Sequence, residues 1–326
     1  MEVHNVTGKE VLVAGGTGLI GIPLVEMLIE EGANVHIVSR DNPTRVPSQA
    51  KSWRDLDLLD YKNCLTACRD MDYVFNLLCV KGSPVWMRDN PETAFRHNLL
   101  LDVNVLGAAA QCGVTGVLLA SSLAVYPPAE VFHEDDVWKG NPSPNDWYGG
   151  WAKRMGEVHA EACRRQYDMA VSVVRPANTY GPWDDFYSSA AMVVPQLIRQ
   201  AVEDGVLQMK GDGSAVRDFI HARDVARGML FTAKQSIDQP INLGSGAGVS
   251  LRELVDVIID TVVPRPKVEW GTEPPPGDKV RVLDTSRAYK LLGFEPEIFL
   301  EEGIQETVQW FVENGEKYRN SRYTVS

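Results

Sequence analysis

The strongest constraint on the fold is a glycine-rich segment near the N-terminus. The apolar run EVLVAGG is followed by TGLIG and then by IPLVEMLIEEG, whose apolar residues recur at helical spacing. Gly15, Gly18 and Gly21 therefore lie between a predicted strand and a predicted helix. In such a turn, the first glycine permits the tight bend, the second lets a pyrophosphate approach the helix N-terminus, and the third allows close packing of helix on strand. The pattern predicts a dinucleotide site at these glycines and the adjoining Leu19 and Ile20.

The alternation of strand-like and helix-like segments continues along the chain. The runs NVHIVSR, YVFNLLC, GVLLASS and MAVSVVRP are short and apolar, and helix-period segments separate them, including one from about Ala152 to Tyr167. Strands that are apolar on both faces and alternate with helices are typical of a parallel sheet covered on both sides. We therefore expect an α/β chain with a Rossmann-type, doubly wound parallel sheet, to which INLGS at Ile241 to Ser245 adds a short strand.

The composition changes after Pro182. A helix-like VVPQLIRQAVEDG and an expected strand pair around GDGSAVRDF precede a C-terminal part that contains PRP and EPPPG. Prolines at this density mark loops and boundaries, which predicts a smaller C-terminal α/β lobe. We assign residues 1–180 and 222–246 to the dinucleotide-binding domain, and residues 181–221 and 247–326 to a lobe that supplies substrate contacts.

Charge and cysteine usage narrow the range of partners. Lys plus Arg total 32 against 44 Asp plus Glu, so the net charge of -12 has the wrong sign for a nucleic-acid binder. We expect no membrane association, because the chain has no apolar window of about 18 residues and no signal-like start. The five cysteines are scattered and odd in number, which fits a reducing compartment and a cytoplasmic protein. His159 and Cys163 lack a third ligand nearby, so no metal site is expected.

The end of the second predicted strand bears on the choice of cofactor. NVHIVSRD ends near Ser39 and Arg40, where an NAD protein carries a carboxylate that binds the adenosine ribose. An arginine is suited to a 2′-phosphate instead, which favours NADP. NAD stays open, because Asp41 follows one residue later.

Several ordered motifs extend the comparison to a known family. They are DLLD, FNLLC, ASSLAVY, RPANTYGP, GDGSAVRDFIHARDVA, INLGSGAGVSLREL and LLGFEP. With the glycine turn, nearly the whole chain resembles the extended short-chain dehydrogenase/reductase family of NAD(P)-dependent nucleotide-sugar epimerases, dehydratases and reductases. The resemblance implies a nucleotide-diphospho-sugar substrate and a homodimer. It also implies that Asp57 and Leu58 contact the adenine and that Leu77, Leu78 and Cys79 line the cofactor.

The family's acid–base device is Tyr-x-x-x-Lys on a helix, aided by a serine or threonine hydroxyl. By resemblance, Lys153 in NDWYGGWAKRMGE is the lysine and Ser122 is the hydroxyl. The position four residues before the lysine is Gly149, however, and Tyr148 is five before. One residue is a rotation of about 100° on a helix, so Tyr148 serves as the base only if the glycine pair opens the helix irregularly. The alternatives are a cofactor-binding protein with lost or altered catalysis, or recruitment of another group such as Tyr126.

The resemblance also assigns substrate contacts. Asn178 in RPANTYGP matches a residue that contacts the bound sugar nucleotide, and Arg217 and Arg281 match arginines that bind its diphosphate. Bidentate arginines suit such a group and reconcile an anionic substrate with an acidic protein.

The residues that two other reaction types of this family require are absent from the matching positions. Leu123 and Ala124 stand where 4,6-dehydratases of the family carry an Asp-Glu pair, and Ala124 and Met192 stand where 3,5-epimerising members use a Cys and a His. The remaining chemistry is hydride transfer at the sugar C4 with one acid–base group. The sequence therefore predicts a 4-epimerase, with an NADPH-dependent 4-keto-sugar reductase as the alternative.

Overall fold

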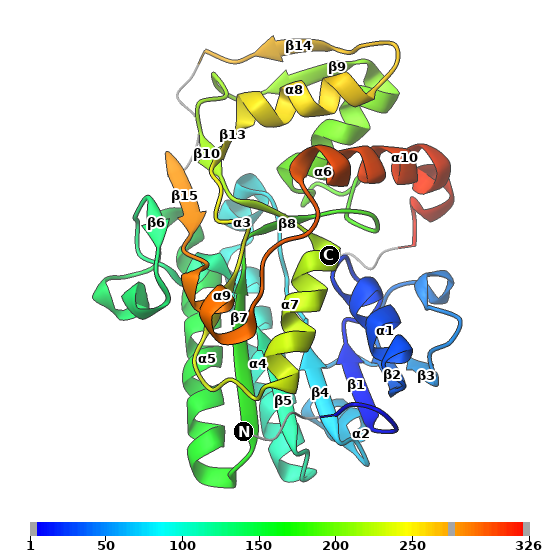
Figure 1. The fold of residues 1–326 in the computed structure, drawn as a ribbon, viewed down its shortest axis with the longest axis vertical. Coiled ribbons are helices and arrows are strands. Elements are labelled where there is room, and N and C mark those ends of the chain that lie inside the picture. Colours follow the sequence, from blue (N-terminus) through cyan, green and yellow to red (C-terminus); the bar gives the residue numbers. More distant parts are fainter. Residues whose placement is uncertain (1–4, 273–277, 322–326) are drawn as a thin grey trace.

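A parallel sheet forms the centre of the computed structural model, which describes residues 5–272 and 278–321 (Figure 1). The sheet has seven strands in the order β12-β7-β5-β4-β1-β2-β3, and every pair is parallel. The strands are β1 (Glu10–Ala14), β2 (Asn34–Val38), β3 (Ser52–Arg54), β4 (Tyr73–Asn76), β5 (Gly116–Ala120), β7 (Ala170–Pro176) and β12 (Ile241–Leu243). The strand order reverses between β1 and β4, and ligands of such sheets bind at the carboxyl ends of the strands there.

Helices cover both faces of the sheet, as the alternating sequence predicts. One face carries α1 (Gly21–Glu30) and α7 (Ala222–Lys234), and the other carries α2 (Tyr61–Cys68), α4 (Pro91–Gln111) and α5 (Trp147–Tyr167). The short helix α3 (Pro84–Asp89) precedes α4, and α9 (Ser286–Leu292) packs near α7 and β12. The structure thus confirms the α/β, Rossmann-type fold.

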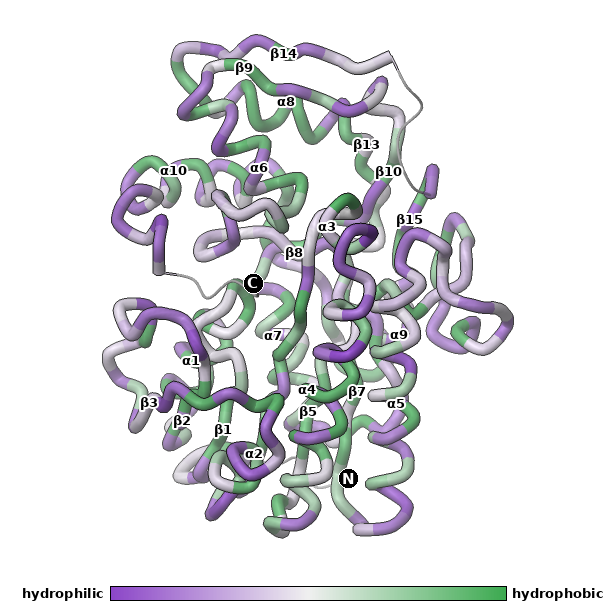
Figure 2. Tube along the Cα trace, turned by 180° about the vertical axis from the view of Figure 1, so that it is seen from behind, coloured by the Kyte–Doolittle hydropathy of each residue, from purple (hydrophilic) through white to green (hydrophobic). Residues whose placement is uncertain are grey.

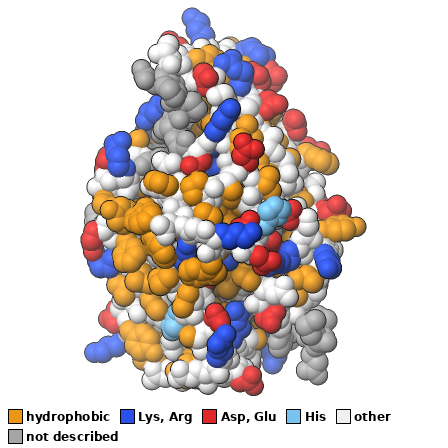
Figure 3. Space-filling model, turned by 90° about the vertical axis from the view of Figure 1, so that its left-hand side faces the viewer, with side chains coloured by type: hydrophobic (Ala, Val, Ile, Leu, Met, Phe, Trp, Pro, Cys, Tyr) orange, Lys and Arg blue, Asp and Glu red, His pale blue; other side chains and the backbone are white. Residues whose placement is uncertain are grey.

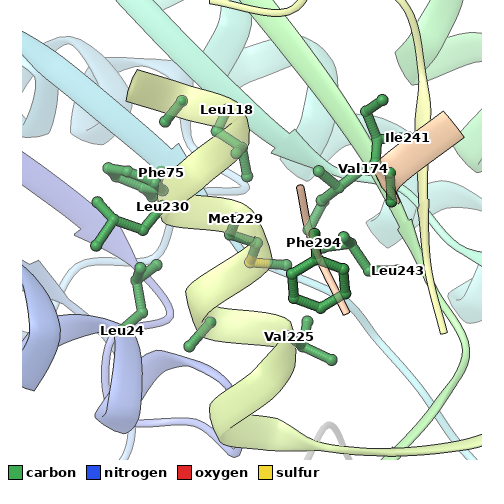
Figure 4. Close-up of a cluster of buried hydrophobic side chains, with 14 of the residues drawn as sticks. Leu24, Phe75, Leu118, Val174, Val225, Met229, Leu230, Ile241, Leu243 and Phe294 are labelled. Atoms are coloured by element: carbon green, nitrogen blue, oxygen red, sulfur yellow. The ribbon is translucent and has the colours of Figure 1, made fainter. Parts of the chain in front are cut away.

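The strands β1, β4, β5 and β7 contribute to two separate cores because successive side chains point to opposite faces. In β1, Val11 and Val13 join the cluster under α1 and α7, whereas Leu12 and Ala14 join the cluster under α2, α4 and α5. Figure 2 shows the resulting hydrophobic colouring along the central strands. In Figure 4, Met229 and other residues of α7 lie among side chains of the sheet, such as Leu118, and near Phe294. Burial on both faces is the reason that these strands read as continuous apolar runs.

Outside the seven-stranded sheet, the chain forms short sheets and a third hydrophobic cluster. A four-stranded sheet has the order β13-β10-β15-β6, and two parallel pairs join β8 to β11 and β9 to β14. The strands are β6 (Val131–Phe132), β8 (Asn178–Tyr180), β9 (Val206–Met209), β10 (Val216–Arg217), β11 (Phe219–His221), β13 (Val249–Ser250), β14 (Lys267–Trp270) and β15 (Val280–Leu283). The remaining α-helices are α6 (Val193–Arg199), α8 (Leu251–Thr261) and α10 (Leu300–Tyr318). Short 3-10 helices are η1 (Pro43–Arg45), η2 (Leu123–Val125), η3 (Glu134–Lys139) and η4 (Pro144–Asp146), and η5 (Gln200–Asp204) is a π-helix.

Three sequence expectations need correction. The strand pair expected around GDGSAVRDF does not pair with itself: β10 pairs with β13 and β15, and β11 pairs with β8. The carboxylate of Asp218, between β10 and β11, accepts backbone hydrogen bonds from Ser245, Gly246 and Leu283, which directs the two strands to different partners. The helix expected from about Ala152 begins at Trp147, and the strand expected to reach Ser245 ends at Leu243.

Within the described residues, no helix combines the length and apolar character needed to cross a lipid bilayer. The proline-rich segment EPPPG, at 273–277, lies outside the described residues.

Candidate active site

The glycine turn joins β1 to α1. Gly15 has a φ of +87°, and its amide donates to the carbonyl of Val38 at 2.8 Å. A Cβ atom at Gly21 would lie 2.1 Å from the carbonyl oxygen of Gly15, so only glycine fits there. A side chain at Gly15 would be strained by the positive φ. The turn therefore leaves its backbone and the first turn of α1 close together at the carboxyl end of β1, where Leu19 is buried and Ile20 precedes the helix.

The end of β2 lies beside this turn. Asp41 accepts a hydrogen bond from the Thr17 hydroxyl at 2.7 Å, and Nε of the buried Arg45 is 3.8 Å from the same carboxylate oxygen. The Asp41 carboxylate is thus engaged by the glycine turn and by η1. Ser39 is buried and hydrogen bonds to the Thr17 hydroxyl.

Arg40, unlike the neighbouring Asp41, points to the surface at the end of β2. Its side chain is exposed, and Nη1 donates to Oδ2 of Asp57 at 3.0 Å. The structure therefore brings together Arg40 and Asp57, two residues that the sequence assigns to the adenosine end of the cofactor. Leu58, next to Asp57, is buried in the core beneath it.

Lys153 is buried on α5 and faces the carboxyl ends of two central strands. Its Nζ donates to the carbonyl of Leu78 at 3.1 Å, to the carbonyl of Ala120 at 3.0 Å and to Oδ1 of Asp102 at 3.0 Å. An ammonium group has three protons, so these acceptors engage all of them. The segment of Leu77, Leu78 and Cys79 after β4 is thereby joined to the predicted lysine.

Asp102 is a site residue that the sequence analysis missed. It is fully buried on α4, and a Cβ at Gly156 would lie 2.6 Å from its Oδ2, so a glycine on α5 makes room for it. Burial raises the pKa of Asp102 to about 6, against the opposing effect of Lys153. Burial alone would lower the pKa of Lys153, but Asp102, Cys79 and Glu157 together outweigh this effect and the pKa is raised. A signal was present in the sequence, because this aspartate interrupts the apolar run LLLDVNVLGAAA.

The two predicted hydroxyl groups after β5 differ in their surroundings. Ser122 is half-buried, and its Oγ accepts a hydrogen bond from the Ala124 amide at 3.1 Å at the start of η2. Tyr126 is buried, with its hydroxyl 2.6 Å from Oδ1 of Asn242 and 2.9 Å from Nη1 of Arg175. Burial raises the pKa of Tyr126 far above neutrality. These contacts make Tyr126 a structural residue and do not favour it as the acid–base group.

The first turn of α5 carries the predicted tyrosine. The helix runs without interruption from Trp147, so the glycine pair does not open it irregularly. Tyr148 is 48% exposed, and none of the hydrogen bonds among the described residues joins it to Lys153 or Ser122. Gly149, on the lysine side of the helix, is buried, and a Cβ there would meet the terminal methyl of Met87 at 3.1 Å. The structure thus brings Lys153 to the carboxyl end of the sheet, and Gly149, not Tyr148, is buried with it on α5.

The predicted substrate residues lie on strands of the smaller lobe. Arg217 on β10 and Arg281 on β15 are partners in the register of two parallel strands. Nη2 of Arg281 is 2.5 Å from Oδ2 of Asp146, which precedes α5, and its Nε is 3.7 Å from Oδ2 of Asp278. Burial and the neighbouring Arg281 lower the pKa of Arg217. Asn178 begins β8, and its amide donates to the carbonyl of Asp218 at 2.9 Å.

The described residues hold no group of three or more His, Cys, Asp and Glu side chains that could bind a metal ion. His159 and Cys163 contact each other, with 3.6 Å between Nε2 and Sγ.

Comparisons with known proteins identify the family and relatives of the chain. A family model described as the NAD dependent epimerase/dehydratase family matches residues 11–244. The chain is 28% identical to GDP-L-fucose synthase of Escherichia coli, over 95% of this chain and 99% of the relative. It is also 28% identical to dTDP-4-dehydro-6-deoxy-D-allose reductase of Streptomyces bikiniensis, over 95% and 98%. The crystal structure of UDP-glucose 4-epimerase with UDP-glucose, from Thermotoga maritima, superposes with a TM-score of 0.82 at 26% identity, covering 94% of this chain and 99% of that one.

Proposed function

The chain belongs to the NAD dependent epimerase/dehydratase family, and on that premise we propose that it transfers hydride at C4 of a nucleotide-diphospho-sugar, as a 4-epimerase. One observation carries the proposal: the site has two parts. A buried lysine ammonium lies at the carboxyl ends of β4 and β5, and a pair of arginines in register lies on β10 and β15 of the lobe. The first part suits a nicotinamide cofactor, and the second suits a diphosphate.

The glycine turn supports a dinucleotide on physical grounds. A Cβ at Gly21 would meet the Gly15 carbonyl, so the helix N-terminus and the strand end are held close enough to receive a pyrophosphate. When bound, the cofactor would accept hydride from the sugar carbon or return it. Lys153 would hold the nicotinamide ribose and exchange one of its three present acceptors for a ribose hydroxyl.

The acid–base step assigns roles to two hydroxyls. We propose that Ser122 hydrogen bonds the C4 oxygen, because a hydroxyl donates to a ketone and accepts from an alcohol. Tyr148 would take the C4 hydroxyl proton as hydride leaves. Tyr148 is half-exposed on the first turn of α5. If Tyr148 does not reach the C4 oxygen, the chain binds a cofactor and lacks this acid–base group.

The absence of further proton-transfer groups supports simple C4 chemistry. Leu123 and Ala124 follow Ser122, so no carboxylate stands there to remove a proton from a neighbouring carbon.

A 4-epimerase and a 4-keto-sugar reductase use the same groups. The reductase is the second candidate, and Arg40 favours it, because its exposed guanidinium at the end of β2 suits the 2′-phosphate of NADPH. We propose NADP as the preferred cofactor on the same ground.

A homodimer through α4 and α5 forms part of the proposal. Hydrophobic side chains gather on the side of the molecule where α5 lies (Figure 3). On α5 itself, Val158 is 43% exposed and Tyr167 is 53% exposed. Exposed apolar surface of this kind marks sites of association. Light scattering tests this point: a monomeric mass would contradict it.

The function is tested by supplying the purified protein with NAD(P)+ and UDP-, GDP-, CDP- and dTDP-sugars, and with NADPH and 4-keto sugars. A C4 epimer in the first assay supports the epimerase, and NADPH consumption in the second supports the reductase. No product in either assay, from protein that binds the cofactor, would contradict both.

A further inference from the structure

The carboxylate of Asp146 lies in an unusual place for a residue that precedes a helix. Aspartate in this position commonly accepts hydrogen bonds from the free backbone N–H groups of the first turn. Asp146 makes no such bond to α5. Its Oδ2 lies 2.5 Å from Nη2 of Arg281 on the smaller lobe instead, and the two side chains are 25% and 12% exposed. The ion pair therefore joins the start of α5 to the arginine pair.

The charges around this ion pair balance without a ligand. Arg217 and Arg281 are in register, and Asp146 and Asp278 supply two carboxylates near Arg281. A nucleotide diphosphate would add two more negative charges to this neutral group. The two carboxylates then compete with the diphosphate for Arg281.

Of the two carboxylates, Asp146 has the better alternative partner. Oδ1 of Asp278 is held by the hydroxyl of Ser143 at 3.2 Å and by the side-chain amide of Asn145 at 3.3 Å. Asp146, once separated from Arg281, stands at the N-terminus of α5, where the free N–H groups and the helix dipole favour a carboxylate. Its release from Arg281 is therefore compensated locally.

We propose that Asp146 is a positioning residue of the substrate site, which holds Arg281 until the diphosphate of the nucleotide sugar takes its place. The exchange frees the first turn of α5, and Tyr148 lies on that turn two residues after Asp146. Phosphate binding is thereby coupled to the first turn of α5, which carries Tyr148. This inference rests on the proposed function, because it takes the two arginines as the diphosphate ligands.

The sign of an affinity change tests the inference. Calorimetry at low ionic strength measures binding of UDP, GDP and inorganic pyrophosphate to wild type and to Asp146→Asn. Removal of the competing carboxylate is expected to tighten binding about fivefold. Asp146→Ser, which keeps a capping oxygen, must change the affinity in the same direction. Asp135→Asn is the matched control, because it removes the same charge from a pair with Arg287.

Hydrogen exchange supplies a second readout. A diphosphate ligand is expected to change the exchange of the backbone amides of residues 147–150 in wild type, and to leave it unchanged in Asp146→Asn, where the ion pair is already absent. Equal or weaker binding by Asp146→Asn, or the same exchange response in both proteins, would overturn the inference and leave the diphosphate site standing. Failure of wild type and Asp146→Asn alike to bind any of the three ligands would overturn the proposed function itself.

Discussion

The ion pair between Arg175 and Glu157 yields a sharp prediction about stability. Arg175, on β7, is 2% exposed and donates to Glu157 through Nε at 2.9 Å and Nη2 at 2.6 Å. Its Nη1 donates to the Tyr126 hydroxyl and to the Glu134 carbonyl, each at 2.9 Å. Glu157 lies one helical turn after Lys153, so this pair fixes the helix that carries the lysine against the sheet.

The variant Arg175→Met keeps much of the side-chain volume and removes the charge. Glu157 is then left as a buried carboxylate whose remaining donor among these contacts is the Ser121 hydroxyl, at 2.5 Å. Breaking a buried pair by removing one partner costs about 3–5 kcal/mol. We expect a loss in the upper part of this range, because the Tyr126 hydroxyl and the Glu134 carbonyl lose their donor as well.

Urea unfolding at neutral pH, followed by circular dichroism, measures the loss. The double variant Glu157→Leu/Arg175→Met buries no unpaired charge and is expected to recover at least about 2 kcal/mol. Arg165→Met, which removes an exposed pair with Glu161, is the control and is expected to cost less than about 1 kcal/mol. The reasoning fails if Arg175→Met costs no more than this control, or if the double variant is no more stable than the single one.

Three further predictions concern the site. Gly150→Ala is expected to cost about 1–3 kcal/mol in unfolding free energy, because its Cβ would lie 2.3 Å from the Ala124 carbonyl oxygen. Gly149→Ala is the control, because its Cβ would meet only the flexible end of the Met87 side chain. Equal losses for the two variants in urea unfolding would contradict this prediction. Arg40→Ser is expected to weaken NADPH binding about tenfold and to leave NADH binding unchanged in fluorescence titrations, and equal changes for both would refute the assignment. The pKa of Asp102 is raised to about 6 from an ordinary 3.8, so the folded state binds this proton more tightly than the unfolded state. The resulting stabilisation is fully present below about pH 4 and is lost as the pH rises through 6. Wild type should therefore lose about 2–3 kcal/mol relative to Asp102→Asn between these pH values, and a constant difference would contradict the shift.

The sequence predicted the parts of the molecule that local patterns encode. The turn from Gly15 to Gly21 could be placed because a strand, its glycines and an amphipathic helix are adjacent in the chain. The alternation of apolar runs predicted the layers, because strands buried on both faces need helices on both sides. Lys153 could be singled out because the family resemblance marks its helix.

Other features depend on tertiary register and left little local signal. Asp102 and Lys153 are 51 residues apart and meet only because α4 and α5 pack together with a glycine at the contact. The pairing of Asp146 with Arg281 depends on how the smaller lobe meets the start of α5. The spacing before Lys153 raised the question of where Tyr148 lies, and on the uninterrupted helix Tyr148 is exposed whereas Gly149 is buried with Lys153.

The central claim is that this chain transfers hydride at C4 of a nucleotide sugar with the aid of Lys153. Proton NMR of wild type incubated with NAD(P)H, NAD(P)+ and nucleotide sugars, including 4-keto sugars, tests it most directly, with Lys153→Met as the comparison. The account predicts that wild type inverts C4 of at least one nucleotide sugar or reduces a 4-keto group, and that Lys153→Met does neither. Wild-type protein that binds both ligands and leaves C4 unchanged in every mixture would contradict the account.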